Sequence, residues 1–368
     1  MSTRVLSMVA AVLTLGMGIA PDVHAQPVVG AVYTMSNAGS GNQILVFDRH
    51  VDGALTPATA VGTGGRGTGA GLGNQGGLVL SDDGAWLLAV NAASNDVSVF
   101  AVEEHGLRLT DVAASGGVRP ISIAVHADLV YVLNASSDAI TGFRLSADGH
   151  LVALSNATRL LSGTGTGPAE VAFSPNGRLL VVTEKNTNLI DVFRVGDDGV
   201  AGDAEPQPSR GATPFGFAFG KRDQLFVSEA FGGAPDASAV SAYRSRHDGT
   251  LDVIDGSVGT HQTAACWVLV TKDGRFAFTT NTGSGSISGY AISHDGALTL
   301  LNADGRDGDT QAHSAPIDLA SSDDGRFLYS LDSGTHTVGA FRIRTDGQLT
   351  PLAFAGGLPA GANGLAAR

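Results

Sequence analysis

The stretch that decides the fold is residues 168–193, PAEVAFSPNGRLLVVTEKNTNLIDVF. It predicts a short strand, an Asn-Gly turn, a second strand, a polar loop and a third strand. The same order of features returns at 77–100 (GLVLSDDGAWLLAVNAASNDVSVF), 265–290 (ACWVLVTKDGRFAFTTNTGSGSISGY) and 316–341 (PIDLASSDDGRFLYSLDSGTHTVGAF). A supersecondary unit that recurs in this way indicates a repeat architecture, so the repeat must be identified before any single motif is interpreted.

Each repeat has the composition of a four-stranded antiparallel sheet. Segments such as 179–183 (LLVVT) and 276–280 (FAFTT) are rich in β-branched and aromatic residues and follow Asn-Gly or Asp-Gly turns. The third strand is followed by a further Asp-Gly pair and a more polar fourth strand, as at 346–352. A single sheet of this kind exposes apolar residues on both faces, so the sheets must pack around an axis. We therefore expect an all-β protein, a β-propeller.

The repeats number seven, and the ends of the chain share one of them. First strands are predicted to begin at Gly77, Pro120, Pro168, Pro214, Ala265 and Pro316. The N-terminal repeat begins with its second strand at 29–34, whereas 361–367 (GANGLAA) resembles the first-strand sequence 73–79 (GNQGGLV). We expect the C-terminal segment to supply the missing strand and close the ring, which leaves no open sheet edge. The prediction is a single seven-bladed β-propeller domain over residues 26–368.

The N-terminal 25 residues have the pattern of a signal peptide. A basic start that contains Arg4 precedes an apolar run at 5–20 and a small-residue site that ends at Ala25. The apolar run is short for a membrane span, so we expect cleavage after Ala25, with an uncleaved anchor as the alternative. The expected location is the periplasm or the exterior of the cell, without membrane attachment after cleavage.

Composition and charge limit the partners. The net charge is −13, charged residues make up 15% of the chain and basic clusters are absent. Nucleic acid and anionic membrane surfaces are therefore not expected partners. Cys266 is the single cysteine, so no intramolecular disulfide can form and the fold must hold by packing.

Seven repeats with turns such as SPNGR at 174–178 resemble the lactonase-type seven-bladed β-propellers, a family that includes bacterial 6-phosphogluconolactonase and fungal 3-carboxymuconate lactonizing enzyme. The resemblance implies an enzyme that hydrolyses or forms a small polar lactone or sugar-acid ring. Family members carry Gly-Pro-Arg-His before a first strand, where this chain has GPAE at 167–170. The family's Asn-Arg and Asn-Glu pairs are matched only in part, by Asn281-Thr282 and by Thr183-Glu184. The resemblance therefore implies a site that lacks the Arg-His pair.

The repeat topology indicates where a site should lie. Loops that enter the first strand of each repeat, and loops between second and third strands, belong to one face of a propeller, here called the entry face. The Asp-Gly and Asn-Gly turns belong to the opposite face, here called the hairpin face. Converging loops favour ligand sites, so we expect the site on the entry face, around the channel mouth.

Two rings of equivalent positions follow from the repeats. The first ring directly ends the second strand and comprises Asn91, Asn134, Glu184, Glu229, Asn281 and Asp332. The second ring lies at the start of the first strand and comprises Gly77, Ser122, Glu170, Gly216, Trp267 and Asp318. Asparagine in the first ring is expected to bind loop backbone through its side chain, so the acidic members are more informative about function.

Three glutamates, Glu170, Glu184 and Glu229, come from neighbouring repeats and are expected on the same face. Carboxylates gathered at a narrow mouth need a cation, a basic side chain or a shared proton, and Lys185 and Arg119 are possible compensating cations. One hypothesis is a metal site of these three glutamates for a divalent cation such as calcium, or an acid/base cluster with Glu184 or Glu170 as catalytic base. The alternative is a set of solvated loop carboxylates.

The linker between the first two repeats, residues 64–77 (GGRGTGAGLGNQGG), is unusually rich in glycine. No βαβ unit surrounds it, so its glycine spacing does not indicate dinucleotide binding. One interpretation is a close approach of the backbone over the channel, with Arg66, Asn74 and Gln75 directed at a ligand; the other is a flexible spacer.

The segment 261–267 (HQTAACW) enters the sixth repeat on the same face, which makes Trp267 a candidate ligand contact and His261 a candidate base for Cys266. A small buried cysteine is the alternative. His313 is a further candidate contact with the ligand. Two functions stay open: an exported lactonase-like enzyme acting on a small molecule, and a non-catalytic propeller that binds a ligand or a protein on its loop face.

Overall fold

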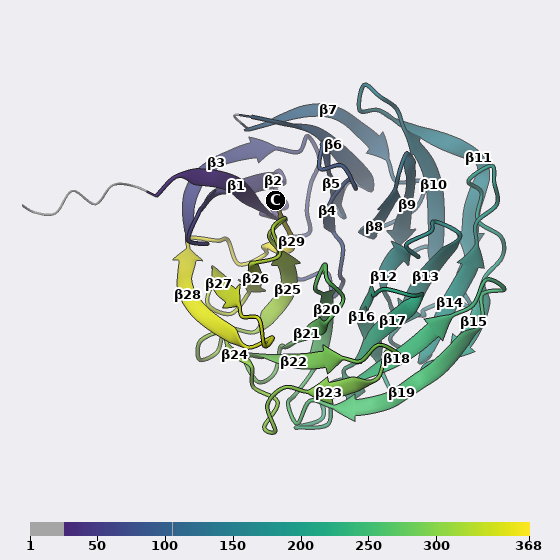
Figure 1. Ribbon diagram of the computed structural model, residues 1–368. Helices are drawn as coiled ribbons and strands as arrows, with labels where there is room; N and C mark the ends of the chain where they lie inside the picture. The colour runs from purple at the N-terminus through teal and green to yellow at the C-terminus, as the bar shows by residue number, and fades with distance from the viewer. Residues whose placement is uncertain (1–25, 105) are drawn as a thin grey trace, which may run out of the picture.

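The computed structural model describes residues 26–104 and 106–368 of the 368-residue chain. Seven antiparallel sheets stand in a ring around a central axis (Figure 1). The predicted all-β class and seven-bladed propeller are confirmed. The expected signal peptide, residues 1–25, lies outside the described residues.

Strands are numbered along the chain, and each blade is given from its innermost to its outermost strand. Blade 1 has β29 (Asn363–Ala367), β1 (Val28–Met35), β2 (Gln43–His50) and β3 (Leu55–Gly62). Blade 2 has β4 (Leu78–Leu80), β5 (Trp86–Asn91), β6 (Asp96–Glu103) and β7 (Gly106–Ala114). Blade 3 has β8 (Pro120–His126), β9 (Leu129–Asn134), β10 (Ala139–Leu145) and β11 (Leu151–Leu160). Blade 4 has β12 (Pro168–Phe173), β13 (Leu179–Glu184), β14 (Leu189–Arg194) and β15 (Glu205–Pro208).

The remaining three blades complete the ring. Blade 5 has β16 (Pro214–Phe219), β17 (Gln224–Glu229), β18 (Ala239–Ser245) and β19 (Leu251–Gly259). Blade 6 has β20 (Ala265–Val270), β21 (Phe276–Asn281), β22 (Ser286–Ile292), β23 (Leu298–Leu300) and the short β24 (Gly308–Asp309). Blade 7 has β25 (Pro316–Ser321), β26 (Phe327–Asp332), β27 (Thr337–Ile343) and β28 (Leu349–Gly356). The 3₁₀ turn η1 (Phe231–Gly233) is short, and the described residues contain no helix long and apolar enough to cross a membrane.

Burial falls from the inner to the outer strands of each blade. Every residue of β13 and of β26 is buried, whereas the outermost strands β11 and β28 are mostly exposed. The apolar side chains of the middle strands pack against the neighbouring blades, so the core lies between blades. This arrangement explains why the second strands read as continuous apolar runs and the fourth strands as polar ones.

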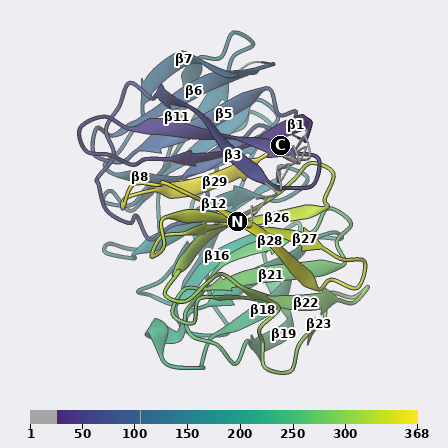
Figure 2. The same ribbon diagram turned by 90° about the vertical axis from the view of Figure 1, so that its left-hand side faces the viewer.

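The C-terminal strand closes the ring as predicted. Antiparallel pairing places Val32 opposite Ala367 and Thr34 opposite Leu365. Figures 1 and 2 both place the C-terminal end of the chain beside β1. Leu365 is 5% exposed and packs in one apolar cluster with residues of blade 7, including Phe327. Closure therefore joins the first and last blades by main-chain pairing and by shared core.

Turn glycines on the hairpin face also join the blades. Gly149, in the turn between the third and fourth strands of blade 3, has a φ of 83° and packs on the ring of Trp86 in blade 2. A Cβ on Gly53 would lie 2.3 Å from the ring of Phe327 in blade 7. The Asp-Gly pairs thus supply a positive φ and also leave room for an aromatic side chain of the preceding blade.

Ring closure should control stability. Removing residues 357–368 should abolish the single cooperative thermal transition, because blade 1 would lose its innermost strand and blade 7 part of its core. Differential scanning calorimetry measures this. An unchanged transition in the truncated protein would show that closure does not hold the ring together.

A point substitution gives a graded form of the same test. Leu365→Ala should lower the free energy of unfolding by about 2–5 kcal/mol, because it removes a buried side chain at the joint. Leu160→Ala, on the outer strand β11 at a residue 71% exposed, should change it by no more than about 0.5 kcal/mol. Urea unfolding of both variants measures the two values.

Candidate functional site

The first ring is buried, and four of its members bind the linkers between blades. All six members have no exposed surface. Asn91 accepts a hydrogen bond from the hydroxyl of Thr63 (2.8 Å), in the linker that leaves blade 1. Glu229 accepts hydrogen bonds from the main-chain N–H of Gly211 (2.7 Å), in the linker that leaves blade 4, and from the hydroxyl of Ser257 (2.6 Å). Asn91 and Glu229 therefore share one structural role, which is to bind the preceding linker, whereas Asn281 and Asp332 bind hydroxyl groups of their own blades.

Glu184 belongs to a pair of carboxyl groups inside blade 4. It accepts hydrogen bonds from the hydroxyls of Ser162 (2.6 Å) and Thr187. Burial, together with the hydrogen bond and the charge of Glu184, raises the pKa of the neighbouring Asp191 to about 8. Asp191 therefore keeps its proton near neutral pH and shares it with Glu184.

The three glutamates do not form the expected metal site. Glu184 and Glu229 accept hydrogen bonds from hydroxyl and N–H donors of their own blades and of the preceding linkers, and Glu170 lies at the central channel. Among the residues that the structure describes, no group of three or more His, Cys, Asp or Glu side chains is arranged to hold a metal ion. The geometry does not favour one calcium site shared by Glu170, Glu184 and Glu229, because the side chains of Glu184 and Glu229 point into the blades.

The glycine-rich linker, residues 64–77, crosses the channel on the entry face. The side-chain amide of Gln75 donates to the carbonyl of Val268 in blade 6 (2.9 Å) and accepts the main-chain N–H of the same residue (3.0 Å). The main-chain N–H of Gln75 donates to the carbonyl of Ala169 in blade 4 (3.1 Å). Lys185 donates to the carbonyl of Gly73 (2.6 Å). The close-approach interpretation of this linker thus fits the structure better than a flexible spacer.

Asn74 and Trp267, expected as ligand contacts, bind the protein itself. Asn74 is 1% exposed; its amide donates to the carbonyl of Ile121 in blade 3 and accepts from Asn363 in blade 1 (3.1 Å). The indole N–H of Trp267 donates to the carbonyl of Asn74 (2.7 Å). The expected channel mouth is therefore filled by the linker and by the side chains that fix it.

Side chains of the second ring accept hydrogen bonds from main-chain N–H groups in the innermost strand of the next blade. Ser122 accepts the N–H of Val171 (3.1 Å), and Glu170 accepts the N–H of Phe217 (2.7 Å). Asp318 accepts the main-chain N–H of Leu319 in its own strand (2.8 Å), and the main-chain N–H of Leu365, in the innermost strand of blade 1, acts to lower the pKa of Asp318. The channel-facing edges of these strands have no neighbouring strand, so a side chain of the preceding blade replaces it.

A cavity of about 290 Å³ lies below the linker, inside the ring of innermost strands. Glu170, Asp318 and Gln75 line its buried end. Burial raises the pKa of Asp318 to about 8. Burial also raises the pKa of Glu170 well above its ordinary value, and the charge of Asp318 adds to the shift. Two carboxyl groups with altered titration thus face a single cavity.

The cavity is reached from the hairpin face. The starts of the innermost strands are buried next to the linker, as at Leu78 and Glu170. Their ends are partly exposed, as at Leu80, Val125 and Ala172. Access is therefore opposite to the face expected from the loops, because the glycine-rich linker closes the entry side.

A cation and two aromatic rings lie at the edge of the linker on the entry face. The Lys185 Nζ is 4.7 Å from the centre of the Phe215 ring, and that ring is 5.0 Å from the ring of Trp267. Burial lowers the pKa of Lys185 to about 8, and the charge of Arg119 adds to this shift. Lys185 therefore stabilises the linker and also places an amine that loses its proton easily at this face.

The remaining candidates do not converge on one point. Arg66, Arg119, His261 and His313 are exposed on loops of the entry face. Burial raises the pKa of the Cys266 thiol to about 11, and this thiol donates to the carbonyl of Ala264 (3.2 Å). No hydrogen bond among the described residues joins Cys266 to His261. Cys266 therefore fits the buried, unreactive alternative.

Asp318 is a functional candidate that the hypothesis of a Glu170, Glu184 and Glu229 cluster did not include. It lies in the second ring at the position equivalent to Glu170, so the repeat alignment contained the signal. The sequence could not show that blades 4 and 7 face each other across the channel, which brings the charge of Asp318 close enough to affect Glu170.

Comparison with protein families places this geometry among known propellers. A family model described as "Lactonase, 7-bladed beta-propeller" matches residues 32–164 and 221–362. The 6-phosphogluconolactonases of Yersinia pestis and Yersinia pseudotuberculosis are 26% identical over 94 residues, 24% of this chain. The match spans 28% of the length of those relatives.

Solved structures share the fold at low identity. A protein from Lactobacillus plantarum superposes with a TM-score of 0.73 at 16% identity, over 92% of this chain and 100% of that one. The periplasmic gluconolactonase of Pseudomonas aeruginosa superposes with a TM-score of 0.68 at 16% identity, over 91% and 98% of the two chains. Identity at this level establishes the common architecture.

The buried carboxyl groups should make stability fall with rising pH. Burial raises the pKa of Asp191, Asp318 and Asp332 to about 8, whereas an unfolded aspartate titrates near 3.9. Between about pH 4 and pH 8 the folded state therefore binds protons that the unfolded state has lost. Each group should contribute a slope of up to about 1.4 kcal/mol per pH unit.

Melting temperatures at pH 5, 6, 7 and 8 test this expectation. The wild type should melt at progressively lower temperature, and Asp332→Asn should make the dependence shallower. Asp197→Asn, at an exposed carboxylate, should leave the slope unchanged. A melting temperature that stays constant or rises from pH 5 to pH 8 would contradict the assignment of protonated buried carboxyls.

Proposed function

The chain belongs to the lactonase family of seven-bladed β-propellers, and from that premise we propose that it hydrolyses a small, uncharged, hydroxylated lactone in the central cavity. The observation that carries the proposal is the pair Glu170 and Asp318, two buried carboxyl groups that line one cavity of about 290 Å³. Carboxyl groups whose titration is shifted by burial are the usual acids and bases of hydrolytic sites.

The two groups suit different roles. Asp318, with its pKa near 8, is partly ionised just above neutral pH and would act as general base. Glu170, with a pKa raised well above its ordinary value, would stay protonated and act as general acid. The main-chain N–H of Phe217 in the next blade holds the Glu170 side chain, and the main-chain N–H of Leu319 holds the Asp318 side chain.

In the proposed reaction a water molecule adds across the ester bond of the lactone. The Asp318 carboxylate takes a proton from the water while the water oxygen attacks the carbonyl carbon. The bond between that carbon and the ring oxygen breaks, and the Glu170 carboxyl gives its proton to the ring oxygen. The product is the open-chain hydroxy acid, and the proton gained by Asp318 returns to Glu170 through solvent.

The charge of the cavity supports an uncharged substrate. The described residues that line it include Glu170 and Asp318 but no Arg, Lys or His. A phosphate or carboxylate on the substrate would therefore meet no positive partner and would be repelled by ionised Asp318. The absence of the family's Arg-His pair at 169–170 supports the same conclusion.

A non-catalytic binding function is the second candidate. Lys185 above Phe215, beside Trp267, offers a cation and aromatic surface on the entry face, where a ligand or protein could bind. On this alternative Glu170 and Asp318 would serve only to satisfy main-chain groups of the next blade. The experiment on turnover separates the two candidates.

We further propose that the protein is exported after cleavage at Ala25. The apolar run at 5–20 followed by a small-residue site supports this, and the gluconolactonase of similar fold is described as periplasmic. N-terminal sequencing of the protein from a periplasmic or culture-medium fraction should begin at Gln26. Recovery of the uncleaved chain from membranes only would contradict export of a free protein.

Purified protein should hydrolyse D-glucono-1,5-lactone faster than the buffer does, with a rate that rises with pH through about 8 as Asp318 ionises. Asp318→Asn and Glu170→Gln should each lower kcat by about 10²-fold or more, the usual contribution of a positioned acid or base. Asp332→Asn is the matched control, because this carboxyl is equally buried but does not line the cavity. The phosphorylated analogue, 6-phosphogluconolactone, should give a kcat/KM at least about tenfold lower.

The turnover of the two lactones by the wild type and its variants decides between hydrolysis and a binding function. Turnover that depends on Asp318 and Glu170 but not on Asp332 supports hydrolysis in the central cavity. Efficient turnover of the phosphorylated lactone would overturn the inference of an uncharged substrate. Lack of turnover of either lactone by a folded protein would favour the binding function.

A further inference from the structure

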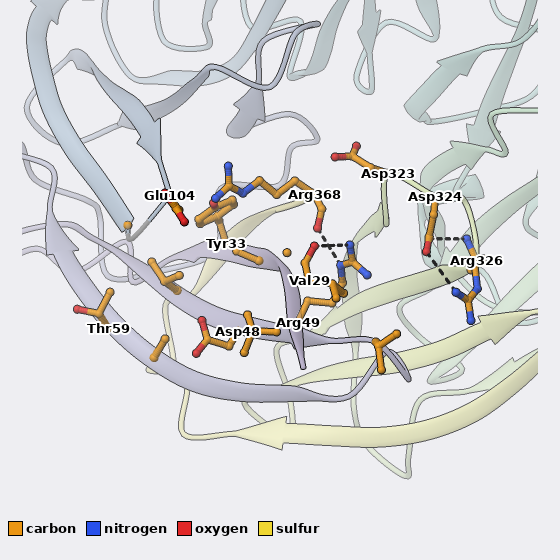
Figure 3. Close-up of a pocket in the computed structure, with 17 residues that line it drawn as sticks. Val29, Tyr33, Asp48, Arg49, Thr59, Glu104, Asp323, Asp324, Arg326 and Arg368 are labelled. Atoms are coloured by element: carbon orange, nitrogen blue, oxygen red, sulfur yellow. Dashed lines mark hydrogen bonds and ion pairs between the residues drawn. The ribbon is translucent and has the colours of Figure 1, made fainter. Parts of the chain in front are cut away.

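Cavities on the hairpin face lie between the turns of neighbouring blades. The largest, of about 1110 Å³, lies at the joint where the ring closes (Figure 3). Four acidic residues and three arginines line it, among them Arg49 and the Asp324–Arg326 pair, so its lining favours neither an anion nor a cation. Two smaller cavities, between blades 2 and 3 and between blades 6 and 7, occupy equivalent places in the repeat and differ in one side chain.

Between blades 6 and 7 an arginine of the protein itself occupies this place. Nε of Arg275 donates to Oδ2 of Asp273 (2.6 Å), and its guanidinium carbon lies 5.0 Å from the centre of the Phe276 ring. Nη1 donates to the carbonyl of Thr345, in the turn of blade 7 (3.3 Å). A carboxylate, an aromatic ring and a carbonyl of the next blade thus bind one guanidinium group.

Blade 7 repeats the carboxylate and the ring. Nη1 of Arg326 lies 3.7 Å from Oδ2 of Asp324, and its guanidinium carbon lies 5.3 Å from the centre of the Phe327 ring. In both blades Oδ1 of the aspartate accepts the hydroxyl that opens the turn and the main-chain N–H of the arginine. The turn therefore fixes the aspartate through Oδ1 and leaves Oδ2 to bind the cation.

Blade 2 has the same turn without the arginine. Residues 81–86 (SDDGAW) align with 271–276 (TKDGRF), so Ala85 replaces the arginine. Oδ1 of Asp83 accepts the hydroxyl that opens the turn (2.6 Å) and the N–H of Ala85 (3.0 Å), as in blades 6 and 7. Among the described residues, no donor reaches Oδ2 of Asp83 and no Lys or Arg lies over the ring of Trp86.

The space of the missing arginine is open. The cavity between blades 2 and 3 has a volume of about 640 Å³, whereas the equivalent cavity between blades 6 and 7 has about 270 Å³. Asp83, Trp86 and Ala147 line the larger cavity. Ala147 occupies the position of Thr345, and its carbonyl accepts no hydrogen bond from the described residues. Trp86 is partly exposed, so the three groups that bind the guanidinium in blade 6 are present and accessible here.

The charge of this cavity favours a cation. Its charged lining residues are Asp83, Asp128 and Arg144. Nη1 of Arg144 donates to Asp128 (2.6 Å), which leaves Asp83 without a cation. The hydrogen bonds from the Ser81 hydroxyl and the Ala85 N–H lower the pKa of Asp83, so its carboxylate is ionised at neutral pH. The net charge of −13 on the whole chain acts in the same direction.

We propose that the cavity between blades 2 and 3 binds the guanidinium group of an arginine, free or within a peptide, between the Asp83 carboxylate, the Trp86 ring and the Ala147 carbonyl. A guanidinium group stacks on an aromatic face and donates hydrogen bonds in its own plane, and tryptophan is the best aromatic partner for a cation. The cavity shares no lining residue with the central cavity, so the proposal does not depend on lactone hydrolysis.

The indole N–H signals in NMR spectra test the proposal, because Trp86 and Trp267 are the only tryptophans. Titration of the protein with N-acetyl-L-arginine amide should shift the Trp86 signal saturably, with a Kd of about 1–10 mM, since exposed ion pairs and cation–π contacts are individually weak. The Trp267 signal should stay, because its indole is buried and donates to Asn74. The neutral N-acetyl-L-citrulline amide should give no saturable shift.

Two variants locate the site. Ala85→Arg should abolish the saturable shift, because it supplies the arginine that blades 6 and 7 carry at this position. Asp83→Asn should raise the Kd by about threefold, the effect of losing an exposed ion pair. Asp197→Asn is the matched control, because this exposed carboxylate lies in a turn of blade 4 outside the cavity.

A saturable Trp86 shift that is lost in Ala85→Arg and kept in Asp197→Asn supports the site. Titration with free L-arginine then separates the two sources: a lower Kd for the amide assigns the site to peptides, and a lower Kd for the amino acid assigns it to free arginine. Absence of a shift in the wild type, an equal shift with the citrulline amide, or a shift that persists in folded Ala85→Arg overturns the proposal. If Ala85→Arg does not fold, an unchanged Kd in Asp83→Asn overturns it.

Discussion

The constraint on which the structure depends is the unpaired edge of each innermost strand. A four-stranded blade in a ring leaves one edge of its first strand facing the channel, where buried N–H groups must still find acceptors. The protein meets this need with side chains of the second ring and with the glycine-rich linker. Ser122 and Glu170 each accept an N–H of the next blade, and Gly76 accepts the N–H of Ile123 with its carbonyl (2.8 Å).

The linker follows from the same constraint. Gly216 has no side chain with which to serve blade 6, and Gln75 takes its place by bonding to Val268. The two positions depend on each other, because a Cβ on Gly216 would lie 2.1 Å from the Gln75 side-chain oxygen. The glycine-rich linker, whose sequence is also compatible with a flexible spacer, thus crosses the channel and closes it on the entry face. The central cavity is consequently closed on the entry face and opens on the hairpin face.

The chemistry of the candidate site is a consequence of this architecture. Glu170 and Asp318 are placed where an acceptor is needed, inside a narrow ring, and burial there shifts their titration upward. The cavity at the joint between the first and last blades has a different cause. Closing the ring with both ends of the chain removes one turn, and the space left contains the buried Arg49. One fold therefore carries an acidic cavity on its axis and, at its seam, a cavity lined by both acidic and basic side chains.

The sequence by itself determined the all-β class, the seven blades and the closing strand, because turn chemistry and strand composition are local and recur in every repeat. The starts predicted at Pro120, Pro168 and Pro214 are the starts of β8, β12 and β16. The sequence also placed Glu170 and Asp318 in equivalent positions. The tertiary structure decided which side chains face the channel and which face into a blade, and so separated Glu170 from Glu184 and Glu229. It also decided which face is open and that Arg49 lies buried at the seam, because these depend on contacts between blades far apart in the chain.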